Sequence, residues 1–410
     1  MNQRIAGHWD AFSAAPHRMM FFSGVLQSLL VLLLWLAELL GRYTPAWAPL
    51  PLSIPSTAAH SLLMLYGVFP FFMFGFLMTT YPRWMRSQPI PRPRYLAAWS
   101  LLSAGLVLLY AGLFLTRWLV AAGVLLMVLG WGWAMAALFQ CYRSAPARNK
   151  SYERYLNLAL LAGGVGLLGY LGWLGSGSER WYLMGRELAL WLFLVPVVVV
   201  VGHRMLPFFS SCVLRPYTVI QPRWSLPLMG LCVAGHLVVE ILRVPAWRLL
   251  FDLPLAVMAV HHSLVWGLRR SFQIRLLAML HLAFLVLGLA MLLYAVQSLA
   301  LWFLPTPILG RAPLHLLVIG CITTLMLAMV SRVSLAHSGR PLEADWLTWG
   351  AYWGLMLAAL LRAMAELPML AAATPGLTLG AATLWLACLA PWGLRLLPMY
   401  VLPRVDGQPG

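Results

Sequence analysis

The chain has 410 residues, of which 62% are hydrophobic and only 10% are charged, whereas an ordinary soluble domain has roughly 25% charged residues. A soluble chain of this length would form two or three domains, and there is too little polar material to cover them. Soluble enzyme folds are therefore excluded. Outer-membrane barrels are also excluded, because their strands alternate apolar and polar residues, whereas the apolar runs here are long and continuous.

The predicted fold class is an all-α, polytopic integral membrane helical bundle in a single transmembrane domain covering residues 1–410. A helix needs about 20 apolar residues to cross the hydrocarbon core. Twelve segments meet that need, and proline and glycine mark most of the breaks between them. The expected spans are residues 19–41, 56–81, 95–115, 117–139, 155–174, 184–206, 225–243, 248–266, 276–298, 310–332, 344–365 and 377–397.

The net charge of +17 comes from 28 Lys and Arg against 11 Asp and Glu. The basic residues form no run, so nucleic acid is not an expected partner. When each Lys and Arg is assigned to its nearest span end, 20 lie on the side that holds both termini and 8 on the other. Basic loops mark the cytoplasmic side. We therefore expect both termini in the cytoplasm, with the lipid bilayer as the main partner.

Histidines inside the predicted spans are the best candidates for chemistry, since ionisable side chains in a membrane are costly and usually face the bundle interior. His60 and His315 each lie about one turn from the outer end of two parallel spans, so we expect them at similar depth. His203, His261, His262 and His281 lie toward the cytoplasmic ends of their spans, and His337 lies just beyond the span at 310–332 on the same side. This distribution predicts two histidine clusters, one on each side of the membrane.

Imidazole is the favoured protein ligand for haem iron and for copper. Two parallel helices that offer histidine at one depth could clamp a haem. Met64, four residues after His60, is either a soft ligand or ordinary core filler. Arg83, Arg204 and Arg332 end three spans on the cytoplasmic side. Each of these arginines is either a lipid-headgroup anchor or a partner for an anion such as a haem propionate.

A second polar pair lies in the span at 225–243, where His236 and Glu240 share a helix face at a spacing of four residues. Two interpretations stay open for this pair. It could relay protons, or it could be a buried hydrogen-bonded pair with a structural role.

The chain resembles the NnrS family, bacterial membrane proteins that carry haem and copper and are linked to nitric oxide stress. The similarity is strongest at His315–Gly320 and at Ser331–Leu342, where the family has a similar H-x-x-x-x-G helix followed by T-R-x-S-L-G-H-T-G-R-P-L. Gly202–Phe209 is similar to the family's G-[GH]-R-x-[IL]-P-F-F, and Leu280–Phe284 to its L-H-x-[GA]-[YF]. With twelve spans and this motif order, the resemblance covers nearly the whole chain.

The second span departs from the family pattern W-H-A-H-E-M-L-F-G. The first histidine is kept as His60, but Leu62 and Leu63 stand at the second histidine and the glutamate. The resemblance implies haem b and possibly copper as cofactors, nitric oxide or a redox partner as partners, and the bacterial inner membrane as location. The residues expected to bind the cofactors are His60, His203, His281, His315 and His337, with Arg204 and Arg332.

Two other functions stay open at this stage, and whether the protein is catalytic is also open. Twelve spans with cytoplasmic termini are typical of secondary transporters, and His236 with Glu240 could move protons. A haem–copper oxidase or nitric oxide reductase core also has twelve spans, and the His261–His262 pair is similar to a copper site there. The glutamate-bearing helix motif of that family is absent from this sequence.

Overall fold

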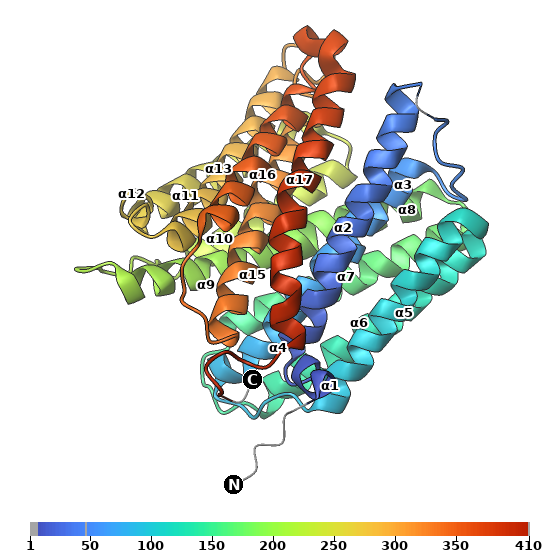
Figure 1. Cartoon of the computed structure of the whole chain (residues 1–410). Coiled ribbons are helices and arrows are strands. Elements are labelled where there is room, and N and C mark those ends of the chain that lie inside the picture. The colour runs from blue at the N-terminus through green and yellow to red at the C-terminus, as the bar shows by residue number, and fades with distance from the viewer. Residues whose placement is uncertain (1–6, 46, 409–410) are drawn as a thin grey trace. The chain divides into compact units, whose positions relative to one another are not determined.

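The computed structural model describes residues 7–45 and 47–408, and in those ranges it contains helices and no strands (Figure 1). The all-α prediction is confirmed. Each of the twelve predicted spans falls on a helical segment, and ten segments of the described chain are long and apolar enough to cross a membrane. Of the remaining two, Ser225–Ile241 is an apolar helix of 17 residues and Trp346–Met364 a helix of 19 residues.

Most helices begin within a few residues of the expected boundaries. In chain order the elements are α1 (His8–Phe12), α2 (Pro16–Tyr43), α3 (Ser56–Leu62), η1 (Leu63–Val68), α4 (Phe69–Met85), α5 (Arg92–Leu115), α6 (Arg117–Ser144), α7 (Ser151–Ser176), α8 (Glu179–Glu187), η2 (Leu188–Leu194), α9 (Val195–Val213), α10 (Ser225–Ile241), η3 (Pro245–Arg248), α11 (Leu249–Val265), α12 (Leu268–Ser271), α13 (Arg275–Ala300), α14 (Ala312–His315), η4 (Leu316–Thr323), α15 (Thr324–His337), α16 (Trp346–Met364), η5 (Pro368–Ala373) and α17 (Thr374–Val401).

The chain divides into two compact units, which are described separately. Within the described residues, unit 1 comprises Met1–Leu194, Val333–Pro341 and Gly393–Gly410. Unit 2 comprises Val195–Arg332 and Leu342–Trp392. Three of the four boundaries between the units fall inside continuous helical segments, so each unit contains parts of the helices that carry the family-like motifs.

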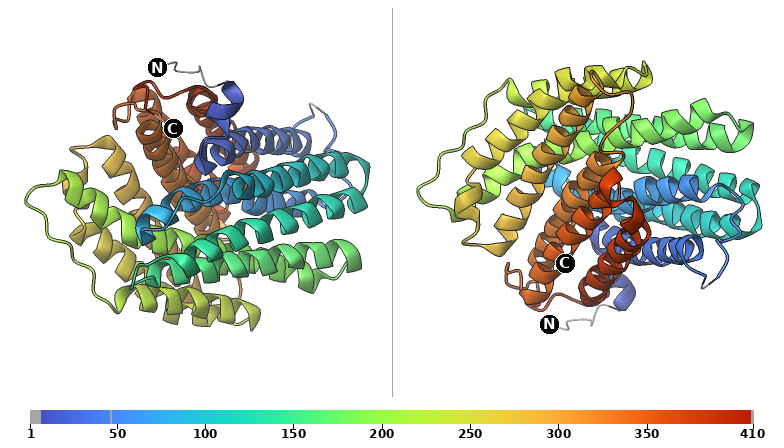
Figure 2. Two further views of the ribbon diagram at one scale, coloured as in Figure 1. Left: turned by 90° about the horizontal axis from the view of Figure 1, so that it is seen from below. Right: turned by 90° about the horizontal axis from the view of Figure 1, so that it is seen from above.

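In unit 1, α5 and α6 form a tightly packed helical hairpin, side by side in both views of Figure 2. Glycines set the close approach of their backbones. A Cβ added at Gly105 would lie 2.6 Å from the carbonyl oxygen of Gly123, and one added at Gly123 would lie 2.6 Å from that of Gly105. Small residues are favoured at helix contacts in membranes because lipid offers no hydrophobic drive between helices, which leaves close packing as the main attraction.

The start of α2 and the end of α17 also meet in unit 1. The guanidinium of Arg18, which is buried, donates to the carbonyl oxygens of Ala11 at 2.6 Å and of Met399 at 3.0 Å. These contacts satisfy a cation that would otherwise be buried without partners. They place the N-terminal end of α2 beside the C-terminal end of α17.

In unit 2, α11 and α13 lie side by side (Figure 1). The hydroxyl of Tyr352 on α16 donates to the carbonyl oxygen of Met279 on α13 at 2.9 Å. Buried tyrosines keep their hydroxyls satisfied in this way because lipid supplies no hydrogen-bonding partner. α13 is buried along most of its length and forms the centre of this unit.

Three spans widen into a π-helical turn: η1, η2 and η4. Pro70 and Pro196 each follow such a turn by two residues, and a proline has no N–H to donate to the carbonyl four residues earlier. In η4 the hydroxyl of Thr323 instead donates to the carbonyl oxygen of Val318, five residues back, at 2.9 Å. His315 immediately precedes η4, and His60 precedes η1 by three residues. π-Turns are frequent at functional sites.

Candidate functional site

Unit 2 brings His203 on α9 together with His262 on α11. Their ring centroids are 5.7 Å apart. Both imidazoles lie against the indole of Trp266, with centroid distances of 5.4 Å for His203 and 4.6 Å for His262. All three side chains are buried, so this end of the unit holds two imidazoles in an aromatic, apolar environment.

His262 has the hydrogen bonding that usually orients a metal ligand. Its Nδ1 lies 2.6 Å from the carbonyl oxygen of Met258, one turn earlier on α11. A carbonyl only accepts, so Nδ1 carries the proton and the lone pair is on Nε2. Nε2 is buried and has no hydrogen-bond partner among the described residues. Histidine ligands in metal sites are commonly held by a bond from the other ring nitrogen to a backbone carbonyl.

His203 is fixed by the chain that follows α9. Its Nε2 lies 2.8 Å from the hydroxyl oxygen of Ser225, which itself donates to the carbonyl oxygen of Pro222 at 2.9 Å. Since that hydroxyl has one proton, it accepts from His203, and Nε2 is the protonated nitrogen. The side-chain amide of Gln221 also donates to the backbone carbonyl of His203.

His281 on α13 completes the polar side chains at this end of unit 2. It is fully buried, and its Nε2 lies 2.9 Å from the hydroxyl of Ser210 on α9. Its Nδ1 is buried without a hydrogen-bond partner in the described part of the chain. Two buried imidazole nitrogens, on His262 and His281, are therefore unsatisfied, and each such group costs about 1–3 kcal/mol.

The family-like segment Gly202–Phe209 also contacts Arg332. The guanidinium of Arg332 lies over the ring of Phe209, 4.0 Å from its centroid, a cation–π contact. The contact holds the Arg332 guanidinium beside Phe209, the last residue of the segment Gly202–Phe209 on α9. Arg204, predicted with it, is half-buried on α9.

His337 lies in unit 1, where it meets a histidine that the sequence did not single out. The rings of His337 and His17 have centroids 4.4 Å apart. Nη1 of Arg83 is 3.5 Å from Nε2 of His337, and Nδ1 of His17 is 3.3 Å from the hydroxyl of Thr79. His17 was missed because it precedes the apolar run, although Pro16, a typical first helical residue, marks the start of α2.

The two predicted outer histidines belong to different units. In unit 1 the imidazole of His60 stacks on the indole of Trp35, with centroids 3.9 Å apart and planes inclined by 24°. In unit 2, Nδ1 of His315 lies 3.0 Å from the carbonyl oxygen of Arg311, the same arrangement as in His262. The haem clamp between His60 and His315 stays a prediction.

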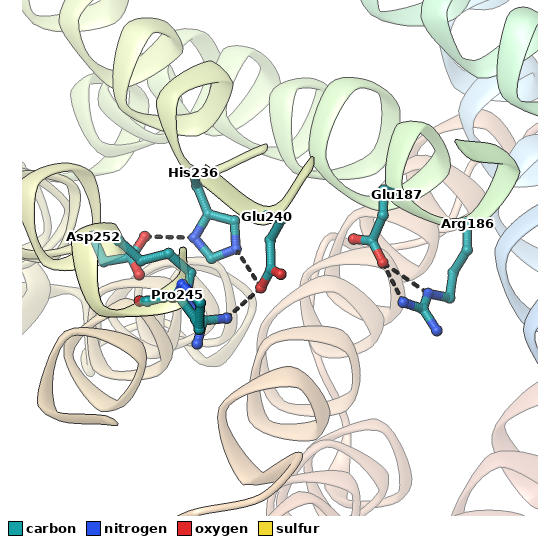
Figure 3. A network of polar contacts seen from close by, with 7 residues as sticks. Arg186, Glu187, His236, Glu240, Pro245 and Asp252 are labelled. Carbon is teal, nitrogen blue, oxygen red and sulfur yellow. Dashed lines mark hydrogen bonds and ion pairs between the residues drawn. The ribbon is translucent and has the colours of Figure 1, made fainter. Parts of the chain in front are cut away.

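A second polar cluster in unit 2 surrounds His236 (Figure 3). Nδ1 of His236 is 2.6 Å from Oδ1 of Asp252, and both side chains are fully buried. Nε2 of His236 is 3.9 Å from Oε1 of Glu240, which also forms an ion pair with Arg248. Asp252 and Arg248 were missed, although an aspartate inside an apolar run was itself a signal. Figure 3 also shows the Arg186–Glu187 pair, which belongs to unit 1.

No group of three His, Cys, Asp or Glu side chains that could hold a metal ion occurs within residues 7–45 and 47–408. The described sites are instead pairs of imidazoles: His203 with His262, and His17 with His337.

Comparison with protein families identifies the chain. The family model described as NnrS protein matches residues 11–404. The chain belongs to the NnrS family. No curated protein shows significant similarity to it. In this NnrS protein, the motif residues His203 and His281 lie in unit 2 and His337 lies in unit 1.

Proposed function

We propose that this NnrS protein binds haem b inside the bacterial inner membrane and acts in the response to nitric oxide. The single observation that best supports a cofactor is His262, whose Nδ1 is bound to the Met258 carbonyl while its buried Nε2 has no hydrogen-bond partner among the described residues. The link to nitric oxide rests on the family.

The donor set fits haem better than copper. A copper ion held by the protein alone would need a group of ligands, and no group of three candidate side chains occurs in the described chain. Haem needs one or two imidazoles, because the porphyrin supplies the other ligands. When bound, haem would supply an iron that can take up nitric oxide or transfer electrons. Copper remains a second proposal that requires ligands from elsewhere.

The residues proposed to hold the cofactor have distinct roles. His203, His262 and His281 offer imidazoles in an apolar, water-poor site, and His337 offers one in unit 1. Arg332, held on the ring of Phe209, and Arg204 would neutralise carboxylate groups of the cofactor. His60 and His315 remain the proposed ligands of an outer haem.

The physiological role can be tested in a strain that lacks the gene. We expect that strain to grow more slowly than its parent under a nitric oxide donor, and expression of the native chain to restore growth. A His262→Ala variant at equal abundance in the membrane should restore growth poorly. Equal growth of the deletion strain and its parent under the donor would contradict the proposed role.

A proton-coupled secondary transporter is the second candidate. The observation that favours it is the approach of His236 to Glu240 within the membrane, at 3.9 Å. The visible absorption spectrum distinguishes the two candidates. A haem protein purified from haem-replete cells shows a Soret absorption band, and a transporter without a cofactor does not.

A further inference from the structure

We infer that Asp252, His236, Glu240 and Arg248 form a membrane-embedded site that binds and stores one proton, loaded through Glu240. This inference goes beyond the haem proposal and does not depend on a cofactor. It rests on the geometry of four side chains from α10, η3 and α11, hereafter the proton-binding tetrad (Figure 3).

The first argument is charge balance. The tetrad holds two carboxyl groups, one guanidinium and one imidazole, joined in the order Asp252, His236, Glu240 and Arg248. With His236 protonated the charges cancel. With His236 neutral and both carboxylates ionised, one negative charge is left in a site where Asp252 and His236 are fully buried. Because an uncompensated buried charge is costly, the tetrad favours holding one extra proton.

The second argument is that one oxygen of Asp252, the most deeply buried carboxyl group of the tetrad, has no hydrogen-bond partner in the described chain. Oδ1 of Asp252 is bonded to His236, but Oδ2 is buried without a hydrogen-bond partner in the described chain. Protonation removes the charge of Asp252 and leaves Oδ2 as a neutral carbonyl oxygen, a weaker acceptor, so it lowers the cost of burying Asp252. We therefore assign the stored proton to the carboxyl group of Asp252.

The third argument is access. The side chain of Glu240 is 30% exposed, while those of His236 and Asp252 are fully buried. Glu240 lies at the end of α10, which the charge bias assigns to the outer side. The contact of 3.9 Å between Glu240 and His236 is longer than a hydrogen bond. One bridging water, or a change of the Glu240 rotamer, would connect the Glu240 carboxyl group to Nε2 of His236 by hydrogen bonds.

The proton balance of loading is simple. A proton on the Glu240 carboxyl passes to Nε2 of His236, while the proton on Nδ1 passes to Asp252. The imidazole ends neutral with its proton on Nε2, Glu240 returns to the carboxylate, and Asp252 becomes a carboxylic acid. No oxidant or reductant takes part. Arg248 pairs with Glu240 and stabilises its ionised form, which returns the entry group to its starting state.

Two further groups face the tetrad and belong to its electrostatics. The ring of Tyr294 on α13 lies edge-on to His236, with centroids 5.1 Å apart, and under the guanidinium of Arg248 at 5.5 Å. Cys232, one turn before His236 on α10, is also buried. The buried ring of Tyr294 covers one side of the imidazole.

Infrared difference spectroscopy of the full chain in liposomes tests the inference. Lowering the pH from about 9 to 5 should produce the carbonyl-stretch band of one buried carboxylic acid. We expect Asp252→Asn to remove that band and His236→Gln to shift the pH at which it forms. Glu240→Gln should slow its formation after a pH jump by about tenfold or more. Glu366→Gln is the matched control, because Glu366 pairs with Arg362 in the same unit without a histidine.

A second measurement needs no variant and covers a failure of Asp252→Asn to fold. The chain has four aspartates, and Asp10, Asp345 and Asp406 lie outside the candidate spans. Labelling the native protein with ¹³C-aspartate should shift the band of the buried acid to lower frequency. A native protein with no titrating carboxyl band, or with a band that the label does not move, would overturn the inference. Neither result bears on haem binding.

Discussion

Buried imidazoles are the residues on which the proposed chemistry depends. His262 and His281 each keep one ring nitrogen without a hydrogen-bond partner in the described chain, and each nitrogen is held inside an apolar unit. Such a nitrogen either lowers the free energy of unfolding, because it is buried without a hydrogen bond, or binds a ligand. The hydrogen bond from Nδ1 of His262 to the Met258 carbonyl leaves the lone pair on Nε2, which makes the ligand role the better explanation.

His262 and its neighbour His261 provide a matched pair of variants. His262 is buried, whereas His261 is exposed on the same helix. We predict that His262→Ala lowers haem affinity by about tenfold or more, because an axial ligand is lost, and that His261→Ala leaves it unchanged. Haem titration of the purified variants measures this. Equal haem affinity in the two variants would mean that His262 only packs against Trp266.

Sequence reasoning found part of this site at the residue level. It singled out His203 and His281 through their motifs, and His236 with Glu240 through their spacing. It named neither His261 nor His262 as a cofactor ligand, because only the packing of α11 decides which of the two is buried. His17 was missed because it precedes the apolar run, and Asp252 because its partner, His236, comes from another helix.

Among the elements, the helices were largely predictable because a run of about 20 apolar residues can satisfy its backbone in lipid only as a helix. The π-turns were not predicted, since apolar composition does not distinguish a π-turn from an α-turn. Pro70 and Pro196 were available as signals for two of them. In the third, the hydroxyl of Thr323 donates to the carbonyl oxygen of Val318, a contact that is visible only in the folded chain.

The α5–α6 hairpin gives a prediction about elements. A Cβ at Gly123 would lie 2.6 Å from the backbone oxygen of Gly105, whereas a Cβ at Gly132 on the same helix would have no atom within 4 Å. Gly123→Ala should therefore destabilise the protein by about 1–3 kcal/mol through overpacking. Gly132→Ala should be neutral or should stabilise it by up to about 1 kcal/mol. Thermal unfolding in detergent compares them. A lower midpoint for Gly132→Ala than for Gly123→Ala would contradict this packing.

At the scale of the whole molecule, hydropathy predicted the helical segments but not which helices are neighbours. The bond from Arg18 to the Met399 carbonyl joins residues 381 positions apart. Nothing in the local pattern around either residue indicates the other. Contacts of that kind arise from the packing of complete helices, which a single sequence does not encode in any local signal.

Orientation is a prediction about the whole molecule. The split of 20 basic residues against 8 places both termini in the cytoplasm. A green fluorescent reporter fused after Gly410 should therefore fluoresce, and alkaline phosphatase fused at the same point should be inactive. Active phosphatase there would reverse the orientation and with it the assignment of the tetrad to the outer side.

Haem content is the most direct test of the central claim that this NnrS protein carries haem on buried histidines. The protein should be purified from haem-replete cells, and its absorption spectrum and haem-to-protein ratio measured for the native chain and for His203→Ala, His262→Ala and His281→Ala. We predict a Soret band in the native protein at about one haem or more per chain, reduced or altered in at least one variant. A correctly folded native protein without a Soret band would contradict the claim and favour the transporter.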